Sequence, residues 1–168
     1  CLHARFGIAN WMVALTYWSR SLDDLYHRNG YRVREASNFL LTLMSNVRAE
    51  ILPTDVPNTT AARIVINAPA STIFELLANP ASHMLFDGSE TIQKSISGPE
   101  RLFLGAKFAM GMKIKIPYRI KNTVVAFEEN KEISWCHLMK WTWTYELADL
   151  GNGSTQVTES FDASAIPG

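Results

Sequence analysis

The sequence predicts an α+β fold in which a curved antiparallel sheet is built around an apolar cavity. A β-rich run at residues 63–67 is followed by a short helical segment and then by six further strand candidates separated by turn residues. Two of these candidates carry large apolar side chains at every second position. The loops between successive strands are short, which favours an antiparallel meander.

The residues before Pro53 have a different pattern. Apolar side chains recur there at helical spacing, which predicts an amphipathic helix over residues 31–52 after one or two shorter helices. Two prolines within residues 53–58 favour an extended link, so we predict an N-terminal helical segment (1–57) and a ligand-binding domain (58–168). The helix is about 30 Å long, enough to cover the apolar face as a lid.

Two short helices are expected after the first strand of the second domain. Ser71 is the predicted N-cap of a helix through residue 77, and Pro80 suits the first turn of a second helix that ends near Phe86. Asp87 and Gly88 then form a predicted turn. The strand candidates that follow are residues 91–97, 107–116, 118–128, 132–138, 141–150 and 155–163.

One face of the predicted sheet is strongly apolar. Lys113 and Lys115 alternate with apolar residues in one strand, so they mark the wet face and the apolar set shares the other. We expect the apolar set either to form core or to line a cavity, since methionine suits both. Its members are Phe108, Met110, Met112, Ile114 and Ile116 in one strand, and Trp141, Trp143, Tyr145 and Leu147 in another.

Composition and charge exclude several classes of partner. The 168 residues hold 16 basic and 16 acidic side chains, so no field favours nucleic acid or an anionic membrane surface. The apolar stretch 6–18 is shorter than the ~20 residues that span a bilayer, so we expect no stable membrane insertion. Two cysteines without a disulfide framework predict a cytoplasmic location. Because the chain opens on Cys1, we expect a fragment.

Several short motifs occur in a specific order and spacing between residues 61 and 163, at residues 64–80, 86–89, 117–122, 127–130, 143–147 and 155–162. Together they resemble the START-like (SRPBCC) helix-grip superfamily, especially its polyketide cyclase/dehydrase and lipid-transport branch. The resemblance implies a seven-stranded sheet that grips a C-terminal helix, with an apolar ligand cavity between them. The chain stops at Gly168, where that helix would begin, so either the chain is truncated or the N-terminal helix takes its place.

Candidate chemistry is sparse. Glu159 alternates in step with Val157 and Phe161, so its side chain could reach the cavity and act there as a general acid or as an anchor for a ligand. The alternative, which we favour, is that the carboxylate lies at the rim in contact with water. His137 and Tyr118 are the other weak catalytic candidates. Cys136 and His137 point to opposite faces, so they form no nucleophile and base pair.

The remaining polar candidates have ordinary interpretations. Tyr118 and Asn122 share a face, and Asp87 and His83 lie where the short helices meet the sheet, so any of the four could orient a polar ligand group. For the last two we favour a turn role for Asp87 and a surface position for His83. The four histidines lack metal-ligand spacing, so we predict neither metal nor cofactor. The predicted ligand-binding residues are Phe108, Met110, Met112, Ile114, Tyr118, Asn122, Trp141, Trp143, Tyr145 and Glu159.

Three functional hypotheses remain. The leading one is binding of a small hydrophobic molecule, such as a lipid, a polyketide-like or an aromatic compound. The second is a cyclase or dehydrase that moves a proton through an inward acid or base, although we lean against an enzyme. The third, implied by the resemblance, is an interaction module of the chaperone-activator type, with a protein partner on the N-terminal helices. No basic recognition helix supports a nucleic-acid partner.

Overall fold

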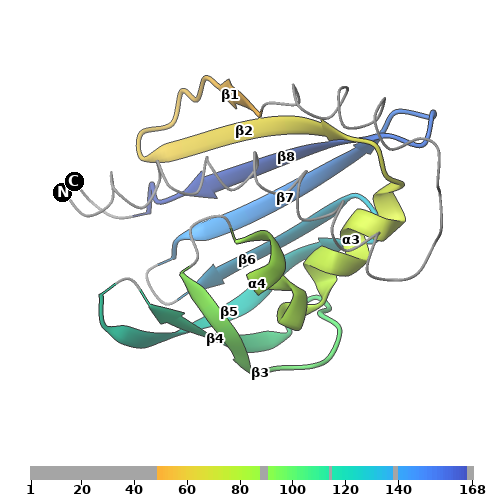
Figure 1. The fold of residues 1–168 in the computed structure, drawn as a ribbon. Helices are drawn as coiled ribbons and strands as arrows, with labels where there is room; N and C mark the ends of the chain where they lie inside the picture. The colour runs from red at the N-terminus through yellow and green to blue at the C-terminus, as the bar shows by residue number, and fades with distance from the viewer. Residues whose placement is uncertain (1–48, 88–90, 114, 138–139, 166–168) are drawn as a thin grey trace.

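The structure is a computed structural model that describes residues 49–87, 91–113, 115–137 and 140–165 of the chain. These residues form an α+β fold with one large, curved antiparallel sheet and short helices on one of its faces (Figure 1). The predicted N-terminal helices and their role as a lid lie outside the described residues, except for residues 49–52. The predicted fold class is therefore confirmed for the sheet and the helices after its first long strand.

The sheet has eight strands in the order β1-β2-β8-β7-β6-β5-β4-β3, and every neighbouring pair is antiparallel. Strands β3 to β8 form the predicted meander, and β8 then pairs with β2, which brings the two ends of the domain side by side. The strands are β1 (Glu50–Leu52), β2 (Thr59–Ile66), β3 (Ile92–Ser97), β4 (Lys107–Lys113), β5 (Pro117–Glu128), β6 (Glu132–His137), β7 (Thr142–Asp149) and β8 (Thr155–Asp162).

Strand β1 corrects the prediction for residues 50–52, which were expected to end a helix. Its three residues pair with β2, Glu50 opposite Arg63 and Leu52 opposite Ala61, and the Glu50 carboxylate accepts a hydrogen bond from Arg63 Nε at 2.7 Å. The edge of β2 offers backbone partners that helical spacing alone does not reveal. The sheet therefore has eight strands where seven were expected. The predicted domain boundary falls in the turn between β1 and β2, and it stays a prediction.

The two predicted short helices are present, with a 3-10 turn between them: α3 (Ala70–Ala78), η1 (Pro80–Ser82) and α4 (His83–Phe86). The predicted cap is wrong, because α3 begins after Pro69, whose carbonyl accepts from Thr72 N, and no side chain caps the helix. Pro80 lies at the start of η1 as predicted, where its missing N–H costs nothing. Asn79 caps that turn by accepting from Ala81 N at 2.9 Å.

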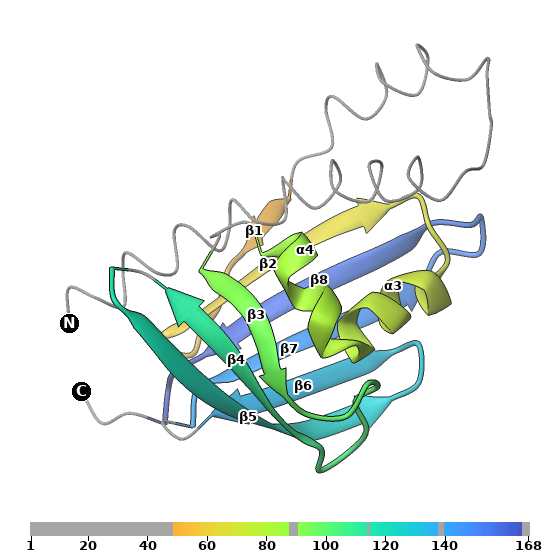
Figure 2. The ribbon, with the colours of Figure 1, turned by 60° about the horizontal axis from the view of Figure 1, so that its bottom comes forward.

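Helices α3 and α4 lie over the same face of the sheet, called here the inner face (Figure 2). Ile73, Phe74 and Leu77 of α3 are fully buried, and the Phe74 ring meets the Phe127 ring edge-on at 5.1 Å. Burial of apolar side chains at about 1.5–3 kcal/mol each is what holds the short helix on the sheet. The amphipathic pattern of α3, rather than its caps, therefore fixes its position.

Strand β4 ends earlier than predicted, whereas β3 ends at Ser97 as predicted. Strand β4 stops at Lys113, and Ile116, predicted on the apolar face, is 77% exposed at the turn into β5. Strand β3 lies at the sheet edge and pairs with β4 through two register shifts, between Ile92 and Lys94 and between Ser95 and Ser97. The chain leaves β3 at Gly98, where φ is +142° and a Cβ would lie 2.6 Å from that of Phe108. Only glycine fits this close approach.

Candidate functional site

The inner face gathers apolar and aromatic side chains from neighbouring strands around one acid. The register places Glu159 of β8 directly between Tyr145 of β7 and Ala62 of β2. Directly paired residues project from the same face, so these side chains are neighbours. The central strands also contribute Ile64, Ile133, Trp135, His137, Trp143, Leu147, Val157 and Phe161 to this face.

Glu159 and Tyr145 form a hydrogen-bonded pair. The Tyr145 hydroxyl donates to Glu159 Oε1 at 2.9 Å, and Tyr145 is 4% exposed while Glu159 is half-buried. Burial raises the pKa of Glu159 to about 7, and the negative charge of Asp87 acts in the same direction, whereas the bond from Tyr145 opposes it. Glu159 therefore lies among inner-face side chains, not at a rim in water, and it can exchange a proton near neutral pH.

Asp87 stands at the end of α4, facing the same region. It is buried, and its Oδ2 accepts from the backbone N–H of Ile92 at 2.5 Å and from Thr91 Oγ1 at 3.4 Å. Its charge contributes to raising the pKa of Glu159, and also those of Tyr145 and Tyr118, each of which is raised first by burial. The prediction that Asp87 only forms a turn therefore missed a contact, because its carboxylate also links the end of α4 to the start of β3 by hydrogen bonds. We call Glu159, Tyr145 and Asp87 the acid site.

His83 of α4 corrects a second prediction. It was expected on the surface, yet it is 2% exposed and stacks on Trp135 with the ring centroids 4.8 Å apart. Its Nε2 lies 2.8 Å from the carbonyl oxygen of Leu77, so that nitrogen carries the proton as donor. Burial lowers the pKa of His83 to about 4, against the opposing effect of the Leu77 carbonyl. His83 is therefore neutral at physiological pH, and its ring packs against the inner face of the sheet.

A second group of rings lies where β6 and β8 end and β7 begins, and we call it the aromatic cluster. Trp143 and Phe161 have centroids 4.5 Å apart, and His137 lies 5.0 Å from Trp141 and 5.6 Å from Trp143. Burial lowers the pKa of His137. Phe161 and Trp143 are neighbours of Glu159 and Tyr145 along their strands, so the aromatic cluster continues directly from the acid site.

The structure places the other predicted site residues without testing their role. Phe108, Met110, Met112 and Asn122 are buried, and Phe108 contacts His83 and Trp135 at 5.6 and 5.8 Å between centroids. Tyr118 is 43% exposed, and Ile114 lies outside the described residues. Of the three catalytic candidates, neither His137 nor Tyr118 is hydrogen-bonded to Glu159. The partner of Glu159 is Tyr145, which was predicted only as a ligand contact.

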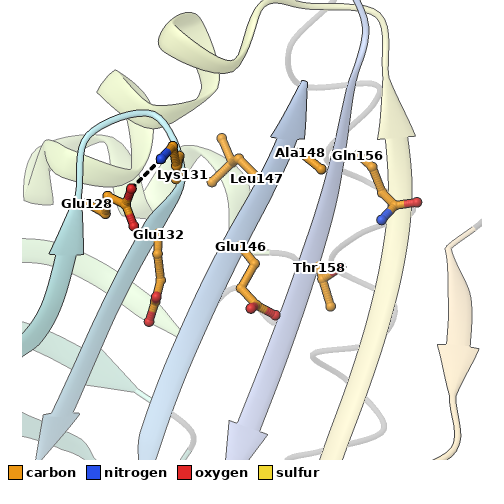
Figure 3. Close-up of a pocket in the computed structure, with 8 residues that line it drawn as sticks. All are labelled: Glu128, Lys131, Glu132, Glu146, Leu147, Ala148, Gln156 and Thr158. Carbon is orange, nitrogen blue, oxygen red and sulfur yellow. Dashed lines mark hydrogen bonds and ion pairs between the residues drawn. The ribbon is translucent and has the colours of Figure 1, made fainter. Parts of the chain in front are cut away.

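A depression of about 370 Å³ lies on the opposite, outer face of the sheet (Figure 3). Glu132, Glu146 and Thr158 form one cross-strand row there, and Lys131 is paired with Glu128 at its end. The lining is polar and wide open, unlike the mostly apolar sites that bind small molecules. We therefore take the acid site, and not this depression, as the candidate site. The remaining lining residues are Leu147, Ala148 and Gln156.

Sequence reasoning missed the burial of His83 and the contact of Asp87 with the sheet. The only available signal was Phe86, an apolar residue three positions after His83 and thus on the same side of a helical turn. Within the described ranges, no group of three or more His, Cys, Asp or Glu side chains is arranged to hold a metal ion. None of the described helices has the length and apolar character needed to cross a membrane.

Comparisons with known proteins find relatives by sequence but no matching family model. An uncharacterised protein of Mycobacterium tuberculosis H37Rv, Rv0088, is 36% identical over 107 residues, and MT0096 of strain CDC 1551 is 35% identical over the same length. Each match covers 63% of this chain and 48% of the relative. The chain thus spans about half the length of the curated relatives it matches.

Solved structures provide the comparison of folds. The Polyketide_cyc-like protein Cgl2372 of Corynebacterium glutamicum has a TM-score of 0.45 at 20% identity, over 61% of this chain and 63% of that one. Two others are more similar in shape. Ms6760 of Mycobacterium smegmatis has a TM-score of 0.53 at 16% identity, over 71% of this chain and 80% of that one. A Rhodobacter sphaeroides protein has a TM-score of 0.52 at 13% identity, over 68% and 77%.

The two higher scores agree with the topology seen here: a long strand, two short helices and six antiparallel strands, with the last strand beside the first. At such low identities the likeness concerns the fold alone. Apart from the additional strand β1, the arrangement is the one that the resemblance in residues 61–163 implied for the sheet and its short helices. The described part of this chain therefore shares the fold of these two structures, and its curved sheet and short helices are consistent with the helix-grip arrangement.

Proposed function

We propose that this protein binds a small hydrophobic molecule, a lipid, a polyketide-like or an aromatic compound, on the inner face of its sheet. One observation carries the proposal: a half-buried acid, hydrogen-bonded to Tyr145, among aromatic side chains. Ligand sites are typically apolar surfaces with a few polar groups that orient the ligand. In this proposal Glu159 and Tyr145 orient the ligand, and Trp143 and Phe161 supply contact area.

Native mass spectrometry of the purified chain, before and after organic extraction, tests the proposal. A small molecule that leaves with the solvent is the expected result, and its mass gives its class. Titration with the neutral dye Nile red complements it. Trp143→Ala should weaken dye binding, whereas Val125→Ala, a smaller truncation at an exposed position of β5, should not. The proposal is contradicted if the intact, folded chain releases no small molecule on extraction and also fails to bind the dye.

A proton-transfer enzyme is a second candidate, favoured by the pKa of Glu159 at about 7. A carboxyl that titrates near the working pH is suited to general acid or base catalysis. In this candidate Glu159 moves the proton and Tyr145 positions it, as in a cyclase or dehydrase reaction. Glu159→Gln should then abolish turnover of a bound substrate while binding persists. A variant that retains turnover would remove this candidate.

Two further expectations concern an alternative function and the location of the protein. The interaction module of the chaperone-activator type places its protein partner on residues 1–57, almost all outside the described residues. A cytoplasmic location is proposed from the cysteine content, and Cys136 is a free thiol in the structure. A pull-down with and without residues 1–48 and a fractionation of the producing cell test the two.

A further inference from the structure

We propose that the bound molecule is a lipophilic cation, an amine or quaternary ammonium whose charged head lies at Glu159 while its apolar part lies on the aromatic inner face. This inference rests on the proposed function and narrows it to a ligand class. Two separate observations support a cationic ligand: the charges that act on Glu159 and the aromatic rings around the acid site. A neutral ligand that accepts a hydrogen bond from Glu159 is the competing ligand class.

The first argument is electrostatic. Among the described residues, the only charge that acts on Glu159 is that of Asp87, which has the same sign. Within the part of the chain that the structure describes, the one hydrogen bond to its carboxylate comes from the neutral Tyr145 hydroxyl, on Oε1. An ionised carboxylate removed from water is costly unless a positive group compensates it. A ligand cation beside Glu159 would supply that compensation.

The second argument is the chemistry of the surrounding surface. The rings of Tyr145, Trp143 and Phe161 adjoin Glu159 on its own strand and on β7, and the Trp135 ring lies 5.4 Å from that of Tyr145. Aromatic faces attract ammonium groups, most strongly where water is excluded. An acid bordered by rings offers a cation both a counter-charge and contact area, whereas a neutral head group gains only from the contact area.

Among the titratable groups around the acid site, Glu159 is the one whose protonation changes near neutral pH. His83 of α4 has a pKa of about 4, burial lowers the pKa of His137 on β6, and burial raises those of Tyr145 and Tyr118. On β2 the neighbour is Ala62, and Arg63 projects to the other face, where it pairs with Glu50. A bound cation favours the ionised form of Glu159, so affinity for a permanent cation should rise as pH increases through about 7.

The test compares benzyltrimethylammonium with neopentylbenzene, its neutral carbon isostere, by titration of the full chain followed by tryptophan fluorescence. We expect the cation to bind roughly tenfold more tightly than the isostere at about pH 8.5, with the preference largely lost at about pH 5.5. Glu159→Gln should remove the preference at both pH values. Glu146→Gln makes the same charge change on the outer face of β7 and should preserve it.

Each other outcome overturns the inference in a distinguishable way. Equal or tighter binding of neopentylbenzene at about pH 8.5 contradicts the cationic ligand and leaves hydrophobic binding in place. A cation preference that survives in folded Glu159→Gln contradicts the placement of the charged head. Failure of both compounds to bind contradicts the proposed function together with the inference. Circular dichroism of each variant shows whether it is folded.

Discussion

Strands β7 and β8 present two contrasting surfaces. On the inner face Tyr145 and Glu159 are hydrogen-bonded among aromatic rings, and on the outer face Glu146 and Thr158 occupy the next positions along the same strands. The outer face has the 370 Å³ depression, yet most of the residues that line it are polar. The comparison shows that an open volume does not by itself identify a site. Burial of an acid beside an aromatic surface is the more informative property.

The largest difference between the faces should appear in stability. Phe74→Ala removes a fully buried ring between α3 and the sheet, and we expect a loss of about 3–5 kcal/mol in the free energy of unfolding. Val65→Ala truncates a half-exposed side chain on the outer face of β2 and should change it by about 0.5 kcal/mol or less. Urea unfolding measures both values. Similar losses of stability for the two variants would show that the inner and outer faces do not differ in burial as described.

The second prediction concerns opposite pH dependences within the inner face. The folded chain keeps a proton on Glu159, whose pKa is about 7, after the unfolded chain has lost it near 4.5, so this acid lowers stability as pH rises between those values. His83 does the reverse: its pKa of about 4 lies below the usual 6.5, so it lowers stability as pH falls through that range. Each effect is on the order of 3 kcal/mol.

Because the two contributions oppose each other over nearly the same range, the unmodified chain should have an almost flat stability profile between about pH 4.5 and 6.5. Glu159→Gln should become steadily less stable toward acid pH, where only the His83 contribution remains. His83→Gln should become less stable toward neutral pH. Urea midpoints measured across this range give the slopes. Parallel profiles for the two variants would show that these groups are not buried as described.

A smaller effect is expected at the rim, where the helices meet the end of the sheet. Arg101 Nη2 donates to Glu75 at 2.8 Å and to Glu129 at 2.5 Å, and its guanidinium lies 5.5 Å from the Phe127 ring centroid. These ion pairs are exposed, so Arg101→Gln should cost only about 0.5–1 kcal/mol, and less at high salt. Urea unfolding at two ionic strengths checks it. A salt-independent loss would show that ring contact dominates.

The smallest effect should come from the outer face itself. Glu146→Gln removes one exposed charge and should change the free energy of unfolding by no more than about 0.5 kcal/mol. It should also leave ligand binding unchanged, because its side chain points away from the acid site. Urea unfolding and Nile red titration test these statements. A loss of dye binding would indicate that the outer depression, and not the inner face, holds the ligand.

Period-two alternation predicted the strands of the sheet well, because one face is buried and the other is wet. The predicted strand at residues 118–128 became β5 at Pro117–Glu128, and alternation also predicted that Tyr145 faces inward. What alternation could not supply is the pairing between strands. The contact of Tyr145 with Glu159 depends on the register of β7 against β8, a non-local property.

The failures have the same physical origin. Residues 50–52 fit helical spacing, but the free edge of β2 pairs with them and makes them a strand. His83 looks like a surface residue of a short helix until Trp135, distant in the chain, provides the ring on which it stacks. Local pattern therefore predicted element types, whereas burial of polar groups came from tertiary contacts that no local window contains.

The irregular pairing of β3 has a consequence for solubility. This strand forms one edge of the sheet, and an edge with free backbone groups can recruit a strand from another molecule. Its two register shifts break the regular spacing of those groups, and Lys94 lies exposed between them. An approaching chain would meet a twisted, charged edge instead of a flat template. The same irregularity that fits β3 against β4 thereby opposes aggregation at this side of the molecule.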